Sequence, residues 1–265
     1  MDSRAKPWGW FIMENTERQI ALHRKACNQL KAFLAECSIK DAQNRKILEV
    51  GFKNGLFLNE CRKAGLIPTG IEINREYYEK VRAEYPNLDV LLYDGQAFPV
   101  PDESFDFVVS YQVLEHVQSI EHVFNECIRV LKPGGIMYHV CPNYHSFYEG
   151  HYKIIWMPFF NRALGRLYLK LLGRYGPGYE TLNLINPKLL GRALERYRND
   201  LTVISLGRKE FINKFNPEQI EKVNQRLLQG VLRLVNNLTF IRRYVLEFIS
   251  WANFYCPITV IAVKI

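Results

Sequence analysis

The sequence predicts an α/β protein built on a mostly parallel sheet, and three observations support this class. Short apolar runs alternate with segments of helical spacing, which is the pattern of βαβ units. The run Ile47–Val50 ends in Gly51, and Gly55 opens the next apolar segment, which indicates a strand, a tight turn and a helix. Apolar residues make up 48% of the 265-residue chain, enough for the core of one large α/β domain, with or without an inserted lid.

The turn between Gly51 and Gly55 is typical of a nucleoside site. Glycines allow positive φ angles there and let backbone amides come close to a ligand. Glu72 ends the next apolar run, 21 residues after Gly51, near the spacing at which an acidic side chain accepts hydrogen bonds from ribose hydroxyls. Lys53 stands where the dinucleotide fingerprint G-x-G-x-x-G has its middle glycine. The turn therefore predicts a nucleoside ligand other than a dinucleotide.

The motif E-x-G-x-x-x-G, from Glu49 to Gly55, resembles motif I of the class I S-adenosylmethionine-dependent methyltransferases. It is most similar to the branch that includes quinone-biosynthesis methyltransferases. Further motifs follow in the order of that family, over about residues 40–143. They are Glu72, Asp94-Gly95-Gln96, the L-E-H element of Leu114 to His116, and L-K-P-G-G from Leu131 to Gly135.

The resemblance implies a single Rossmann-like methyltransferase domain over residues 1–265. Its sheet would have seven mostly parallel strands with the last one antiparallel, helices on both faces, a helical N-terminal segment at 1–40 and a helical cap inserted at 144–184. It implies S-adenosyl-L-methionine as the cofactor. The implied cofactor-binding residues are Glu49, Gly51, Lys53, Gly55, Glu72, Ile73, Asp94, Gly95, Gln96 and Gln112.

Lys53 is the main departure from the family, which usually has a glycine at this position. We expect its side chain to point to solvent while the loop bends slightly differently. The alternative is an altered pocket that binds the cofactor weakly or prefers a modified sulfonium with an extra negative charge. Asp94 likewise has two interpretations, a ligand of the adenine amino group or a simple turn residue.

Patterning along the chain predicts each element in order. The helices predicted are one or two over Trp8–Cys37, then Gly55–Lys63, Arg75–Glu84 capped by Asn74, Ile120–Leu131, Pro187–Arg198 and a long stretch over Pro217–Trp251. The further strands predicted are Ile67–Ile73, Leu88–Tyr93, Phe105–Tyr111, Gly135–Cys141, Leu201–Leu206 and Pro257–Ile265, the last inserting antiparallel as in the family.

Three histidines, His116, His145 and His151, are candidates to orient or deprotonate the acceptor, although each has a structural alternative. His139 lies inside a predicted strand and is expected to be a core residue. Because His139, His145 and His151 recur every six residues, which suits no common metal spacing, the sequence predicts no metal. The six cysteines form no C-x-x-C pair, which predicts neither zinc nor disulfides and favours a cytoplasmic location.

Charge is unevenly distributed. Residues 1–143 carry 17 Lys and Arg against 19 Asp and Glu, whereas residues 144–265 carry 18 against 8. The basic half favours an anionic partner, unless it is only a solvated face. Within the aromatic-rich cap, Arg162, Arg166, Lys170 and Arg174 stand four residues apart beside several leucines. This helix either lies on an anionic membrane or grips a lipid-linked substrate, or it is a lid with a basic outer face and core-facing leucines.

The sequence therefore predicts a methyltransferase for a small-molecule acceptor, such as a glycan, a lipid-linked compound or a secondary metabolite, with peripheral membrane contact as one possibility. Three alternatives stay open. They are an RNA or protein methyltransferase that uses the basic half, a binding protein without catalysis in which Lys53 disables the cofactor site, and an enzyme of a modified sulfonium. Nucleic acid is the less favoured partner because the residues after the fourth strand read S-Y-Q-V instead of N-P-P-Y.

Overall fold

The computed structural model describes residues 8–214 and 239–265. The chain divides into two compact units, Met1–Pro99 and Val100–Ile265. Most of the predicted helical stretch Pro217–Trp251 lies outside the described residues, and its described end is α11 (Thr239–Trp251). The prediction of a single domain over the whole chain stays a prediction.

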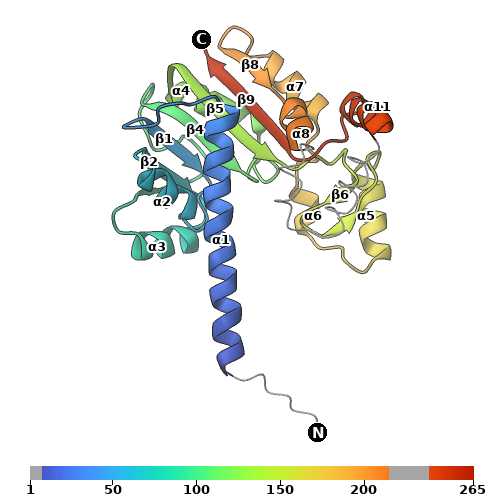
Figure 1. Ribbon diagram of the computed structural model, residues 1–265, viewed down its shortest axis with the longest axis horizontal. Helices are drawn as coiled ribbons and strands as arrows, with labels where there is room; N and C mark the ends of the chain where they lie inside the picture. Colours follow the sequence, from blue (N-terminus) through green and yellow to red (C-terminus); the bar gives the residue numbers. More distant parts are fainter. Residues whose placement is uncertain (1–7, 215–238) are drawn as a thin grey trace. The chain divides into compact units, whose positions relative to one another are not determined.

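The first unit alternates strands and helices (Figure 1). A single long helix, α1 (Trp8–Glu36), occupies the region where one or two were predicted, and it packs against α2 (Leu56–Lys63). β1 (Lys46–Val50), β2 (Ile67–Glu72) and β3 (Asp89–Leu92) pair in parallel, β1 with β2 and β2 with β3. Asn74 caps α3 (Arg75–Glu84) as predicted, because its side chain accepts from the amide of Tyr77.

The second unit carries the remaining strands and the cap (Figure 1). β4 (Phe105–Tyr111) leads through α4 (Ile120–Val130) to β5 (Leu131–Cys141), and the two strands are parallel. The cap contains the short pair β6 (Tyr148–Glu149) and β7 (Ile154–Ile155), followed by α5 (Arg162–Leu171) and α6 (Gly178–Thr181). The chain continues through α7 (Pro187–Glu195), β8 (Leu201–Ser205) and α8 (Arg208–Lys214), and after α11 it ends in β9 (Ile258–Lys264).

The predicted sheet is confirmed. Seven strands follow one another in the order β3-β2-β1-β4-β5-β9-β8, and β9 is antiparallel to both of its neighbours. The boundaries differ from the predicted ones by a few residues, most at β5, which begins at Leu131 instead of Gly135. β9 is buried along most of its length, which explains why its residues are apolar and β-branched.

One prediction about the cap helix α5 is wrong. Two of its basic side chains contact the rest of the cap, and Arg162 donates to the carbonyls of Tyr179 and Leu182 at 2.8 and 2.5 Å. Arg166 forms a two-bond ion pair with Glu180 at 2.7 and 2.8 Å. Three leucines of the helix, Leu164, Leu167 and Leu171, are exposed instead, Leu171 to 78%, and only Leu169 is buried. The interpretation of α5 as a lid with a basic outer face and core-facing leucines is therefore wrong.

Gly165 explains part of this orientation. It is buried, and a Cβ at this position would collide with the hydroxyl of Tyr179 and the ring of Trp156. These two rings belong to the buried cluster that forms the core of the cap, together with Tyr144, Leu169 and Leu182. The glycine costs helix propensity, yet it lets α5 approach this cluster closely.

No helix in the described part of the chain is long and apolar enough to cross a membrane. All six cysteines are free thiols.

Candidate cofactor and acceptor sites

The glycine loop after β1 is held by the carboxylate of Glu72. Oε2 of Glu72 accepts from the amide of Lys53 at 3.0 Å, and Oε1 accepts from the amides of Ile73 and Asn74 at 2.9 and 3.0 Å. Glu72 is buried, and these three hydrogen bonds fix the loop and the start of the following segment. A carboxylate has about four acceptor positions, so one position on Oε2 remains for a ligand hydroxyl.

Lys53 adopts the conformation that a glycine would favour. Its φ is +49°, and Gly51 and Gly55 on either side have φ values of +77° and +67°. The side chain of Lys53 is exposed, as the first interpretation expected. The loop therefore keeps three left-handed residues, and the lysine contributes its backbone amide to the bond with Glu72.

Glu49 is a second buried carboxylate in this unit. It is 5% exposed, and among the described residues its Oε2 has no hydrogen-bond partner. Burial, together with the neighbouring charge of Glu72, raises the pKa of Glu49 well above its ordinary value. A buried acceptor without a donor is costly, so this oxygen suits a ligand that brings an N–H group.

The turn after β3 contains the predicted residues Asp94, Gly95 and Gln96. Oδ1 of Asp94 accepts from the amide of Gln96 at 2.9 Å, and Gly95 has a φ of +88°. This hydrogen bond supports the interpretation of Asp94 as a turn residue, and its role as a ligand of the adenine stays a prediction. Ile73 lies beside this turn, since its Cδ1 is 3.5 Å from the position of a Cβ on Gly95. Ile73 is 64% exposed, so the turn adjoins an apolar surface.

In the second unit, the segment after β4 brings together Glu115, His116 and His151. Nε2 of His116 lies 3.3 Å from Nε2 of His151, and both lie near Oε1 of Glu115, at 3.9 and 4.0 Å. Glu115 is fully buried, and burial raises its pKa to about 7. The predicted Gln112 also belongs to this segment. Its φ is +58°, and its amide donates to the carbonyl of Val140 at 2.7 Å.

Two residues that the sequence did not single out hold this cluster in place. Glu149 is buried and lies 2.8 Å from Nδ1 of His151, and this hydrogen bond raises the pKa of His151. Asn183 donates its side-chain amide to the carbonyls of Leu114 and Val117, and its backbone amide to that of Glu115. The E-x-H spacing of Glu149 and His151 was visible in the sequence, but the contact of Asn183 with a segment 66 residues away was not.

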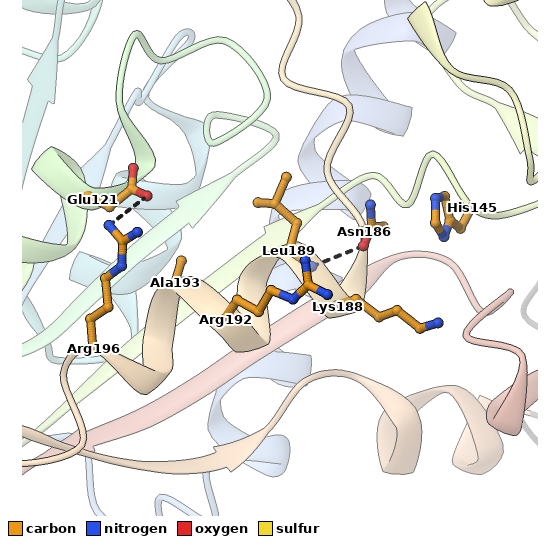
Figure 2. Close-up of a pocket in the computed structure, with 8 residues that line it drawn as sticks. All are labelled: Glu121, His145, Asn186, Lys188, Leu189, Arg192, Ala193 and Arg196. Carbon is orange, nitrogen blue, oxygen red and sulfur yellow. Dashed lines mark hydrogen bonds and ion pairs between the residues drawn. The ribbon is translucent and has the colours of Figure 1, made fainter.

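His145 lies in a basic pocket. Figure 2 shows it with Lys188 and Arg192 of α7, and with Arg196 directly after this helix, in a pocket of about 430 Å³. Burial and the charge of Lys188 lower the pKa of His145. Arg196 pairs with Glu121 at 3.6 Å. The surroundings of His145 therefore suit an anionic group better than proton removal.

His139 is a core residue, as predicted. Its Nδ1 lies 2.6 Å from the hydroxyl of Ser110, and the ring is completely buried. Burial lowers its pKa to about 3, so the ring is neutral in the folded protein at ordinary pH.

Comparison with known proteins finds methyltransferases over part of the chain. Residues 48–139 match the model of a methyltransferase domain family. A probable S-adenosylmethionine-dependent methyltransferase of Mycolicibacterium smegmatis is 33% identical over 106 residues, which cover 40% of this chain and 41% of the relative. A ubiquinone biosynthesis O-methyltransferase of a Chelativorans species is 24% identical over 138 residues, covering 48% of this chain and 54% of the relative. The chain thus spans only about half or less of the length of these relatives.

A solved structure extends the likeness in fold to most of the chain. The S-adenosylmethionine-dependent methyltransferase of Mesorhizobium loti has a TM-score of 0.55 and 15% identity, covering 86% of this chain and 94% of that one. At this identity the likeness concerns the fold alone. The family match assigns residues 48–139 to a methyltransferase domain, and the relative that is 33% identical over 106 residues is of the S-adenosylmethionine-dependent type.

Proposed function

We propose that this protein transfers a methyl group from S-adenosylmethionine to a nucleophile on a small-molecule acceptor. The observation that carries the proposal is the pair of buried carboxylates at the glycine loop. Glu72 shapes the loop and keeps one acceptor position, and Glu49 has a buried oxygen without a donor among the described residues. A nucleoside with ribose hydroxyls and a nearby amino group brings an O–H donor for Glu72 and an N–H donor for Glu49. The two residues therefore fit this cofactor.

The remaining roles follow from the local geometry. The left-handed residues Gly51, Lys53 and Gly55 let the backbone of the loop come close to the ligand, and Ile73 beside Gly95 offers an apolar side chain to a flat adenine ring. Asp94 and Gln96 belong to the same turn, and we assign both to the adenine. A cofactor role for Gln112 stays a prediction of the family resemblance. The sulfonium supplies a methyl group on a good leaving group, so the protein contributes proximity and alignment.

We assign acceptor activation to His116 and His151. Glu149 orients His151 through Nδ1, which leaves Nε2 facing His116 and Glu115. His145 is the weaker candidate because its neighbours are cationic. We assign His145, Lys188 and Arg192 to an anionic group of the acceptor instead, since their pocket is open to a phosphate or carboxylate.

The acceptor class follows from the outer surface of the cap. Leu167 and Leu171 of α5 are 55% and 78% exposed, and Phe159, just before this helix, is 79% exposed. Exposed apolar side chains that share one segment favour contact with lipid or with a lipid-linked acceptor. The arginines of this segment do not carry the proposal, because they are bound within the cap. We therefore propose a lipid-linked acceptor, methylated at a membrane surface to which the enzyme binds peripherally.

The experiment that tests this function is transfer of a labelled methyl group from S-adenosylmethionine. The purified protein is incubated with separate lipid, small-molecule, RNA and protein fractions, and Glu72→Ala is the control. We expect label in the lipid or small-molecule fraction with the wild type alone. Label in RNA or protein would support the macromolecular alternatives. Cofactor binding without label in any fraction would support a binding protein without catalysis.

A further inference from the structure

The cluster of Glu115, His116 and His151 has the donor set of a metal site. Two imidazole nitrogens and one carboxylate oxygen lie within 4.8 Å of one another. This combination holds zinc in several hydrolases and non-haem iron in oxygenases, and both arrangements leave positions open for substrate or water. The sequence predicted no metal, because that prediction used only the spacing of His139, His145 and His151 and did not include Glu115 and His116.

The carboxylate of Glu115 supplies a second, independent observation. Its side chain is 0% exposed, and neither oxygen has a hydrogen-bond partner among the described residues. A buried carboxylate without a partner is expensive, and folded proteins normally pair such a group or use it to bind a metal. Oε1 points toward both imidazoles, as the distances of 3.9 and 4.0 Å indicate. A cation between these three atoms would satisfy the carboxylate.

His151 is oriented as a metal ligand usually is. Nδ1 donates to Oε1 of Glu149 at 2.8 Å, and Oε2 of Glu149 in turn accepts from the amide of Tyr152 at 2.6 Å. With its proton on Nδ1, the neutral ring presents the lone pair of Nε2 to Glu115 and His116. A carboxylate behind a ligating histidine is the common support of metal-bound imidazoles.

The distances fit an ion after a small adjustment. Ligand atoms about 2.0–2.1 Å from a tetrahedral ion lie about 3.3 Å apart. The two Nε2 atoms are 3.3 Å apart, and the distances of 3.9 and 4.0 Å to Glu115 exceed this value by about 0.6–0.7 Å, which a small rotation of its side chain would correct. His116 is 51% exposed and His151 31%, so one side of the cluster is open to solvent.

We propose that Glu115, His116 and His151 bind one divalent transition-metal ion, such as Zn²⁺ or Fe²⁺, with Glu149 as the positioning residue of His151. This inference does not depend on methyl transfer. If the proposed function also holds, the ion would bind the acceptor hydroxyl at the open position and lower its pKa, in place of a histidine acting as the base.

Titration with Co²⁺ tests the proposal without any turnover. The whole purified protein is treated with a chelator, dialysed, and titrated with Co²⁺ while its visible absorption is recorded; Zn²⁺ is then added in competition. We expect one equivalent of Co²⁺ to give a visible spectrum that Zn²⁺ removes. Affinity should fall at least about 100-fold in Glu115→Gln and His116→Ala, and about 10-fold in Glu149→Gln.

His145→Ala is the matched control, because it removes a histidine of the same unit outside the cluster. Glu115→Gln is nearly isosteric, and the carboxylate accepts no hydrogen bond from the described residues, so this variant should fold normally by circular dichroism. The proposal is overturned if folded wild type shows no Co²⁺ spectrum. It is also overturned if Glu115→Gln and His116→Ala bind Co²⁺ as tightly as the wild type, since the two histidines would then only share a proton.

Discussion

Replacing Lys53 by glycine tests how the loop tolerates a lysine. A non-glycine residue in the left-handed region costs about 1–2 kcal/mol, and the φ of Lys53 is +49°. Glycine would remove this cost but gain freedom in the unfolded chain, worth about 0.4–1 kcal/mol. The net expectation is a stabilisation of about 0.5–1 kcal/mol, or roughly 1–4 °C in Tm for a chain of this size.

Lys53→Ala is the matched control for this experiment. Alanine keeps the Cβ that opposes the left-handed conformation and removes only the exposed amine, so its stability should equal that of the wild type. Both variants retain the backbone amide that donates to Glu72 at 3.0 Å, so both should bind S-adenosylmethionine as the wild type does. Urea unfolding and calorimetric titration measure the two quantities.

Two results would refute this reasoning. Equal stability of Lys53→Gly and Lys53→Ala would mean that the backbone of the loop is not strained at this position. A loss of cofactor affinity of about 10-fold or more in Lys53→Ala would mean that the amine contacts the cofactor, and would revive the altered pocket.

Three further predictions concern the buried and basic groups. The pKa of Glu49 is raised in the folded protein, so this carboxyl destabilises the folded state once the pH exceeds the ordinary pKa of a glutamate. Glu49→Gln should therefore be more stable than the wild type at pH 8, as measured by thermal unfolding. Burial lowers the pKa of His139 to about 3 in the folded protein, so the free energy of unfolding should decrease as the pH falls below 6.5, by about 2 kcal/mol at pH 5. Urea unfolding at several pH values measures this dependence, and His139→Asn should weaken it. Lys188→Ala and Arg192→Ala should each raise KM for a phosphorylated acceptor several-fold while cofactor affinity stays unchanged, whereas Arg196→Ala should do little because Arg196 already pairs with an acidic side chain. Three results would count against these predictions: Glu49→Gln no more stable than the wild type at pH 8, the same pH dependence of stability in His139→Asn as in the wild type, or an equal rise in KM in all three basic variants.

The sequence predicted the first unit well because its signals are local. Gly51 and Gly55 indicate left-handed backbone conformations within one five-residue turn, and Glu72 is the last residue of β2. The three-amide contact of Glu72 could not be read from the sequence, although the residue itself was identified. The antiparallel last strand came from the family resemblance, since β-branched composition gives no direction.

The cap was predicted less well because its signals are ambiguous. A stripe of basic residues such as Arg162, Arg166 and Lys170 on α5 can face solvent or protein, and composition alone does not decide between the two. Glu180 decides it here by pairing with Arg166 from a segment 14 residues further on. His116 and His151 were found as separate candidates, but their contact spans 35 residues, and the support of Glu149 became visible only once β6 was placed.

The most direct test of the cofactor site is calorimetric titration of the purified protein with S-adenosylmethionine and S-adenosylhomocysteine, repeated with Glu72→Gln and Glu72→Ala. We expect micromolar binding of both ligands by the wild type. Affinity should be weaker in Glu72→Gln, which keeps one acceptor oxygen, and should fall at least about 100-fold in Glu72→Ala, which releases the loop as well. Absence of binding by the folded wild type, or equal affinity in Glu72→Ala, would contradict a cofactor site centred on Glu72.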